Sequence, residues 1–195
     1  KWAGAEPIIT VNREEAINRW TGTTSTDWNT ASNWSAGHAP TSTENAVLED
    51  VETNDPVIST GTFSCNSLVI DPGACLTVES AGTLDVDDLI IINSTGLSNT
   101  GSLINRGTVT ATVLFNRFLR AEDNMGSRHF FSSPVSGMTI SSFFSENINL
   151  GELWEWDETD ASWPHVVSGE LLSGKGYNLA QTTGSLGEYS FIGSV

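Results

Sequence analysis

The chain has 195 residues, enough for one large or two modest domains, and 38% of them are hydrophobic, which is enough to fill a core. Its 24 acidic residues outnumber 8 basic ones, the net charge is -16, and no Lys or Arg lies between Trp20 and Asn105. This balance excludes nucleic-acid binding, which needs clustered basic side chains, and the lack of a long apolar stretch predicts no membrane insertion.

Residues 1–19 form an introductory segment with no assigned role. Three tryptophans follow it, at Trp20, Trp28 and Trp34, among Thr, Ser and Asn. They suit a sugar-stacking surface or a cover for the open end of a coiled β structure, whose first turn has no predecessor to bury it. We favour the cover, because spacings of eight and six residues put the rings on different turns of the chain.

Short runs of apolar residues, separated by turn residues, make up residues 61–115. Runs of three or four residues suit strands, since helices need about ten residues or more. Phrases recur loosely at roughly 18 to 24 residues, which indicates a solenoid that buries its side chains by stacking coil on coil. The clearest runs are residues 68–70, 76–78, 84–86, 89–92 and 103–104.

The two cysteines, Cys65 and Cys75, are too few for a structural zinc site and lack redox spacing. Two alternatives stay open: a disulfide around the turn at residues 71–74, or two unpaired thiols. Strand alternation points Cys75 away from Leu76 and Cys65 away from Leu68, so we expect both thiols to face out of the interior.

From residue 116 aromatic residues become dense, and the pattern changes to longer alternating strands. Residues 153–157 alternate strictly, residues 158–162 suit a hairpin turn, and the chain returns through residues 163–167. Further strands are expected at residues 174–179 and 189–192. The predicted fold is therefore all-β: a parallel β-helix over residues 20–115 with a Trp-rich cap, then an antiparallel, sandwich-like domain over residues 116–195.

The hairpin carries the candidate binding groups. Trp154, Trp156 and Trp163 can form an aromatic row that stacks on sugar rings, or they can belong to the core of the sandwich. Carboxylates crowd the turn between them, and oxygen ligands at such density can hold Ca²⁺. The metal candidates are Asp157, Glu158 and Asp160, although no EF-hand pattern is present and solvated turns are the favoured interpretation.

Motifs for catalysis are scarce. Neither H-E-x-x-H nor G-x-S-x-G occurs, and the three histidines are scattered. The pairs Asp85 with Asp87 and Glu155 with Asp157 offer the two carboxylates of a glycosidase, but spacing by two residues on a strand is common. We assign no catalytic residue and expect no cofactor other than Ca²⁺.

Several phrases resemble one class of proteins. They are Trp-Thr-Gly, Asp-Trp-Asn and Asn-Trp-Ser within residues 20–40, Cys-Asn-Ser-Leu-Val-Ile-Asp-Pro-Gly-Ala at residues 65–74, and the later Phe-Ser-Ser-Pro-Val and Gly-Lys-Gly-Tyr. The chain resembles the secreted, adhesin-like β-repeat proteins of the Bacteroidetes cell surface. The resemblance implies export, often by the type IX route with a C-terminal sorting domain. None is visible, so we expect a fragment of a longer protein.

The sequence thus predicts a non-catalytic extracellular protein that binds a glycan or protein ligand as an adhesion scaffold. The alternative is a carbohydrate-active enzyme, either a glycoside hydrolase or a polysaccharide lyase, or its accessory binding domain.

Overall fold

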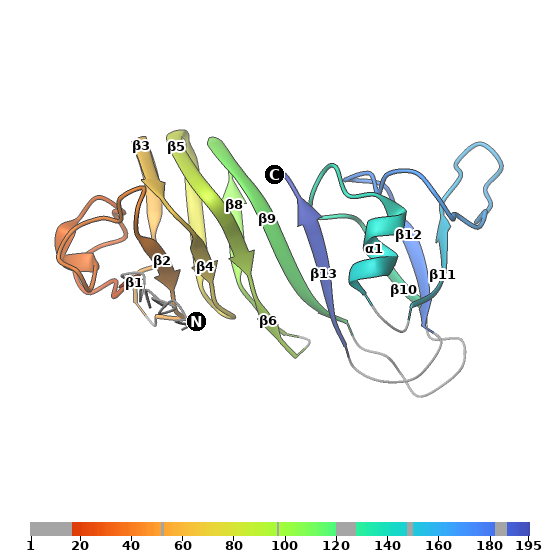
Figure 1. Ribbon diagram of the computed structural model, residues 1–195, viewed down its shortest axis with the longest axis horizontal. Helices are drawn as coiled ribbons and strands as arrows, with labels where there is room; N and C mark the ends of the chain where they lie inside the picture. Colours follow the sequence, from red (N-terminus) through yellow and green to blue (C-terminus); the bar gives the residue numbers. More distant parts are fainter. Residues whose placement is uncertain (1–16, 52, 97, 120–127, 148–149, 182–186) are drawn as a thin grey trace, which may run out of the picture.

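The chain winds into a parallel β-coil and then forms antiparallel sheets, as the sequence predicts (Figure 1). The computed structural model describes residues 17–195 except 52, 97, 120–127, 148–149 and 182–186, so most of the introductory segment lies outside the described residues. The strands of the coil are β1 (Ile17–Arg19), β2 (Asn45–Leu48), β3 (Val57–Cys65), β4 (Leu68–Ile70), β5 (Cys75–Ile92), β8 (Ser102–Asn105) and β9 (Thr108–Leu119). A small hairpin of β6 (Ser94–Thr95) and β7 (Asn99–Thr100) projects from it.

Two flanks of parallel strands enclose the interior of the coil. On one flank β1, β2, β4, the end of β5 and β9 follow one another, and on the other β3 pairs with the first part of β5. Ala46 pairs with Leu68, Leu68 with Ile90 and Ile90 with Val113, so this flank repeats every 22 or 23 residues. All four side chains are fully buried and form one column of the core.

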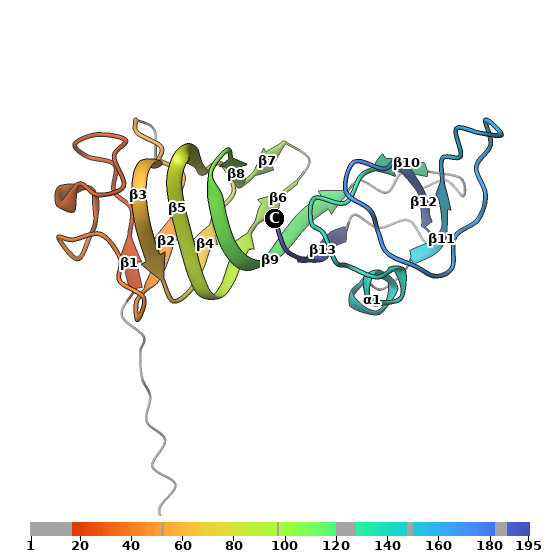
Figure 2. The same ribbon diagram turned by 90° about the horizontal axis from the view of Figure 1, so that it is seen from above.

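The apolar runs that the sequence separates are joined in the structure. β5 runs through 18 residues and bends around the coil instead of ending at the small residues 80–83, and β3 and β9 curve beside it (Figure 2). The bend is possible because Gly82, within β5, sits close to the backbone carbonyl of Ile58 in the preceding coil. A side chain at that position would push the two coils apart.

Polar side chains form a second column along the coil. The Asn93 side-chain amide N–H donates to the Asp71 carboxylate at 3.3 Å, and the Asn116 side-chain amide N–H donates to the side-chain oxygen of Asn93 at 3.2 Å. The Ser190 hydroxyl extends the series by donating to the side-chain oxygen of Asn116 at 2.8 Å. Because stacked amides satisfy one another, this column fixes how each coil sits on the last.

The three tryptophans of the cap are buried together at the start of the coil. The Trp34 ring lies edge-on to Trp28 at 4.7 Å and to Trp20 at 5.1 Å, and the Trp34 indole N–H donates to the Trp28 carbonyl at 2.7 Å. The backbone at Trp28 also bonds to Val57 at the start of β3. At most 3% of any of the three residues is exposed, so the rings leave no surface on which a sugar could stack.

The C-terminal part is built on a three-stranded antiparallel sheet in the order β10-β12-β11. Its elements are β10 (Arg128–Phe131), α1 (Ile140–Glu146), β11 (Leu150–Glu155), β12 (Tyr177–Gln181) and β13 (Gly187–Gly193). β13 leaves this part and pairs antiparallel with β9, so it lies between the coil and the sheet (Figure 1). The expected boundary between residues 115 and 116 falls inside β9. No helix in the described part of the chain is long and apolar enough to cross a membrane.

Candidate functional site

The predicted hairpin at residues 153–167 is formed. Trp154 bridges to His165 and Asp157 to Ser162, with backbone hydrogen bonds in both directions between Asp157 and Ser162 at 2.9 and 3.2 Å. The turn closes through Ala161, whose φ of 48° lies in the left-handed region. The hairpin extends beyond β11 and carries all three candidate tryptophans.

The structure brings two of the three predicted tryptophans together. The Trp156 and Trp163 rings are 5.3 Å apart and tilted by 52°, whereas the Trp154 ring contacts His165 at 5.8 Å. All three tryptophans are half-buried. The rings thus make a stepped surface, and the single flat row is not formed.

Phe130 extends this surface and was not singled out from the sequence. Its ring lies 5.6 Å from Trp163 and the side chain is 70% exposed. The neighbouring Phe131 points to the opposite face and packs on Phe143 and Tyr177. The alternation of side chains along β10 could have distinguished Phe130 from Phe131, because adjacent strand residues point to opposite faces and one of the two must face outward.

Register across the small sheet puts the candidate groups on one face. Phe130 of β10 lies opposite Asn178 of β12, and Asn178 lies opposite Trp154 of β11. Residues directly opposite on neighbouring strands share a face. We call the outward-facing set of Phe130, Trp154, Trp156 and Trp163 the aromatic surface.

Asn178 is the polar group within this row. The side chain is only 3% exposed, and its amide oxygen has no hydrogen-bond partner in the structure. A buried acceptor without a donor costs free energy, so such groups in native proteins call for an explanation. A ligand hydroxyl or a water molecule that reaches the row between Phe130 and Trp154 would satisfy it.

The carboxylates of the turn do not gather into a metal site. Among the described residues, which include Asp157, Glu158 and Asp160, no three acidic, histidine or cysteine side chains are grouped to hold a metal ion. Asp157 instead accepts hydrogen bonds from Thr159, which lower the pKa of its carboxyl, and its side chain caps the turn.

The carboxylate pair of the enzyme alternative is engaged in other contacts. Glu155 forms an ion pair with Lys175 at 2.7 Å, and this carboxylate raises the pKa of the lysine. Asp157 is held by the turn.

Both cysteines are free, so no disulfide links Cys65 to Cys75. The expectation that both face outward is wrong for Cys65, which is fully buried in the core, whereas Cys75 is half-buried. β3 ends at Cys65 and β4 begins at Leu68, and the two residues between them turn a corner. Side chains do not keep their strand alternation through that corner, so the direction of the Cys65 side chain cannot be inferred by counting back from Leu68.

The comparisons with known proteins identify a family whose function is unknown. Residues 19–191 match the model of a domain of unknown function, DUF8693, so the chain belongs to that family. No curated protein matches the chain, and no solved structure matches it.

Proposed function

We propose that this member of the family is a non-catalytic extracellular binding module, and that its aromatic surface binds neutral carbohydrate. The observation that carries the proposal is the contiguous group of Phe130, Trp163 and Trp156, in which Phe130 is exposed and both tryptophans are half-buried. Contiguous apolar patches that remain at a protein surface often mark interaction sites.

The stepped rings suit the chemistry of sugars. One face of a pyranose ring carries C–H groups that bury apolar area against an aromatic ring, while its hydroxyls need hydrogen-bond partners at the edge. Rings tilted by 52° and 59° favour a chain that bends or twists between sugars over a flat crystalline face.

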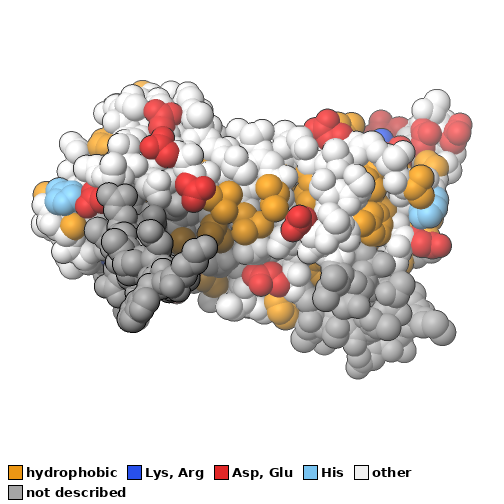
Figure 3. Space-filling view, in the orientation of Figure 1, with side chains coloured by type: hydrophobic (Ala, Val, Ile, Leu, Met, Phe, Trp, Pro, Cys, Tyr) orange, Lys and Arg blue, Asp and Glu red, His pale blue; other side chains and the backbone are white. Residues whose placement is uncertain are grey.

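Charge selects among glycans. The chain carries a net charge of -16, and Figure 3 shows acidic side chains over both parts of the molecule and almost no basic ones. An anionic glycan would be repelled as it approached this surface. Neutral glycans therefore fit best.

Binding is favoured over hydrolysis. A glycosidase needs two carboxylates on either side of the scissile bond. Beside the aromatic surface, Glu155 is paired with Lys175 and Asp157 is bonded to Thr159. A coil with a cap at one end and a ligand-binding surface at the other also suits a scaffold for adhesion.

The test compares binding of the protein to a panel of immobilised neutral and acidic glycans, followed by calorimetric titration with the best neutral oligosaccharide. We expect Trp163→Ala to weaken that binding at least tenfold, because Trp163 contacts both Phe130 and Trp156. Trp163→Phe keeps an aromatic ring and should restore part of the affinity. The matched control is Val167→Ala, since Val167 is an apolar residue of the same returning segment, residues 163–167, and is 72% exposed.

Equal binding by the wild type and Trp163→Ala, with Trp163→Ala folded, would refute the role of the aromatic surface. Release of reducing sugar or of an unsaturated product by the wild type would replace the proposal with the enzyme alternative. Preference for acidic glycans would contradict the argument from charge.

A further inference from the structure

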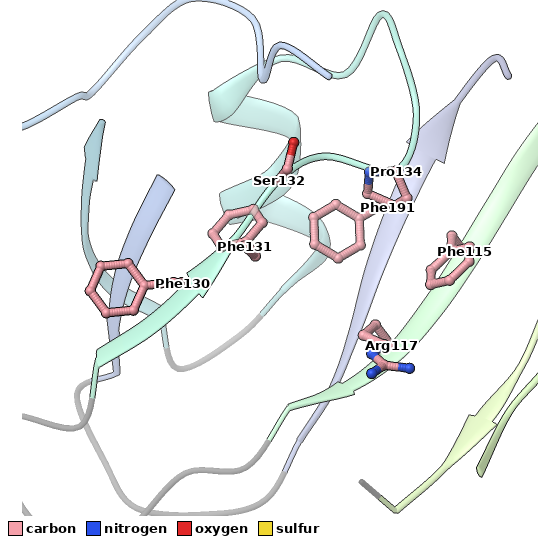
Figure 4. A pocket seen from close by; sticks show the side chains of 7 residues that line it. All are labelled: Phe115, Arg117, Phe130, Phe131, Ser132, Pro134 and Phe191. Carbon is pink, nitrogen blue, oxygen red and sulfur yellow. The ribbon is translucent and has the colours of Figure 1, made fainter. Parts of the chain in front are cut away.

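A pocket lies where the coil meets the C-terminal part. It is a pocket of about 250 Å³ between β9, β13 and the end of β10 (Figure 4). Aromatic rings make up most of its wall, and a guanidinium and a hydroxyl complete it. The lining residues are Phe115, Arg117, Phe130, Phe131, Ser132, Pro134 and Phe191.

The aromatic wall is held in place from behind. Phe191 is buried, and its ring lies 5.1 Å from Phe143 of α1 and 5.6 Å from Phe131. Phe131 in turn packs on Phe143 at 5.6 Å. A wall supported in this way presents a preformed apolar surface, which reduces the entropy lost when a ligand binds.

Arg117 is the charged group of the pocket. In the part of the chain whose side chains are described, it is the basic residue that no carboxylate pairs with. The other three described basic side chains each bind a glutamate: Arg19 binds Glu49, Arg106 binds Glu79 and Lys175 binds Glu155. Arg117 donates one hydrogen bond, to the Thr100 hydroxyl, and a guanidinium has five N–H donors.

An arginine that pairs with no carboxylate among the described residues stands out in so acidic a protein. With 24 acidic residues in the chain, ion pairs are easily formed at the surface. A guanidinium presents two parallel N–H donors that match the two oxygens of a carboxylate, and such bidentate pairs are stronger than neutral hydrogen bonds. One positive group beside an apolar wall fits a ligand with one negative group on an apolar body.

We propose that this pocket binds a carboxylate carried on a small apolar or aromatic body, with Arg117 holding the carboxylate and the phenylalanines holding the body. A volume of about 250 Å³ is slightly below the usual range for drug-sized ligands, so the occupant is the size of a single amino-acid residue. A free aryl carboxylic acid and the C-terminal residue of a peptide both present this chemistry. The site does not depend on the aromatic surface, from which it shares only Phe130.

The test titrates the intact chain with phenylacetate, with N-acetylphenylalanine and with N-acetylphenylalanine amide, followed by calorimetry. We expect the two acids to bind and the amide, which has the same apolar body without the charge, to bind at least tenfold more weakly. Equal binding of acid and amide by the wild-type protein, or no binding of either acid, would overturn the proposal without any variant.

Variants then assign the charge to Arg117. Arg117→Gln should abolish the preference for acid over amide, while Arg117→Lys, which keeps the charge and loses the paired donors, should retain part of it. The matched control is Arg106→Gln, since Arg106 lies on the coil outside the pocket and should leave the preference unchanged. Persistence of the full preference in folded Arg117→Gln would refute the assignment.

A peptide with a free C-terminal phenylalanine separates the two sources of the carboxylate. Tighter binding of the peptide than of phenylacetate supports a protein or peptide terminus as the natural occupant, and equal binding supports a small acid. Both outcomes keep the carboxylate site.

Discussion

Cys65 shows how far burial alters the chemistry of a single side chain. Its thiol lies in the core, opposite Val86 of the next coil. Burial raises its pKa from the ordinary 9.0 to about 12, and the Asp87 carboxylate contributes to the rise. Cys75 is half-buried, and burial together with Asp55 raises its pKa as well. Because the thiolate is the reactive form, both thiols are expected to resist alkylation in the folded protein.

The raised pKa of Cys65 predicts a loss of stability in alkali. Above pH 9 the unfolded chain ionises this thiol while the folded chain keeps it protonated up to about pH 12. The unfolded state then binds fewer protons, so the free energy of unfolding falls by roughly 1.4 kcal/mol for each pH unit in that window. Urea unfolding of the wild type and of Cys65→Ala between pH 8 and about 11 measures it.

Cys65→Ala should lower stability at neutral pH, because it leaves a small cavity, and should flatten the alkaline decline. Cys75→Ala serves as the control and should retain most of that decline. Parallel pH profiles for the wild type and Cys65→Ala would show that Cys65 does not ionise on unfolding.

Among the strands, glycine at one corner of the coil permits close stacking. Gly61 of β3 pairs with Gly82 of β5. Gly107 lies at the same corner in the next coil, directly before β9, where Thr108 pairs with Thr83 of β5. A Cβ atom on Gly107 would overlap the backbone carbonyl oxygens of Glu79 and Gly82. The strands bend there with no side chain between successive coils.

Gly107→Ala is expected to destabilise the protein by about 1–3 kcal/mol, because neighbouring backbone cannot move aside as a flexible side chain can. The matched control is Gly176→Ala, since a Cβ atom there would meet nothing within 4 Å. Thermal and urea unfolding of both variants give the comparison. A Gly107→Ala protein as stable as the Gly176→Ala protein would contradict the steric account.

The strand pattern shows what sequence can predict and where it stops. The coil was predictable because short apolar runs such as residues 68–70 and 89–92 recur along the chain between turn residues, and side chains within each such strand alternate with period two. Cys65 was misplaced because a corner resets that period, and the length of a corner is set by contacts with the neighbouring coil. Trp156 and Trp163 were found from composition, but their tilt and the addition of Phe130 depend on how β10 and the hairpin pair across the sheet.

At the scale of the whole molecule, β13 joins the two parts. Its backbone pairs with β9 from residue 187 to residue 193 and so covers the edge of the coil at residues 113–119. An uncovered edge would present unpaired N–H and C=O groups to other chains. Its side chains Tyr189 and Phe191 are buried, and the Phe191 ring packs on Phe131 of β10 and stacks on Phe143 of α1. We therefore expect the two parts to unfold together.

Phe191→Ala tests this coupling. Removing a buried phenylalanine costs about 3–5 kcal/mol, and the loss should lower the unfolding temperature of both parts. Ile192→Ala is the matched control, because Ile192 is the next residue on β13 and is 38% exposed, so its removal should cost less than about 1 kcal/mol. Scanning calorimetry should show one transition in all three proteins. Two separate transitions in the wild type would refute the coupling.

The amide column from Asp71 through Asn93 to Asn116 makes length adjustable in fixed increments. Each coil takes 22 or 23 residues and advances the chain by one strand spacing, about 4.8 Å. Duplicating one such unit would preserve every stacking partner on either side of the insertion. Adding or removing such units would therefore change the distance between the aromatic surface and the tryptophan cap, one coil at a time, without redesigning either end.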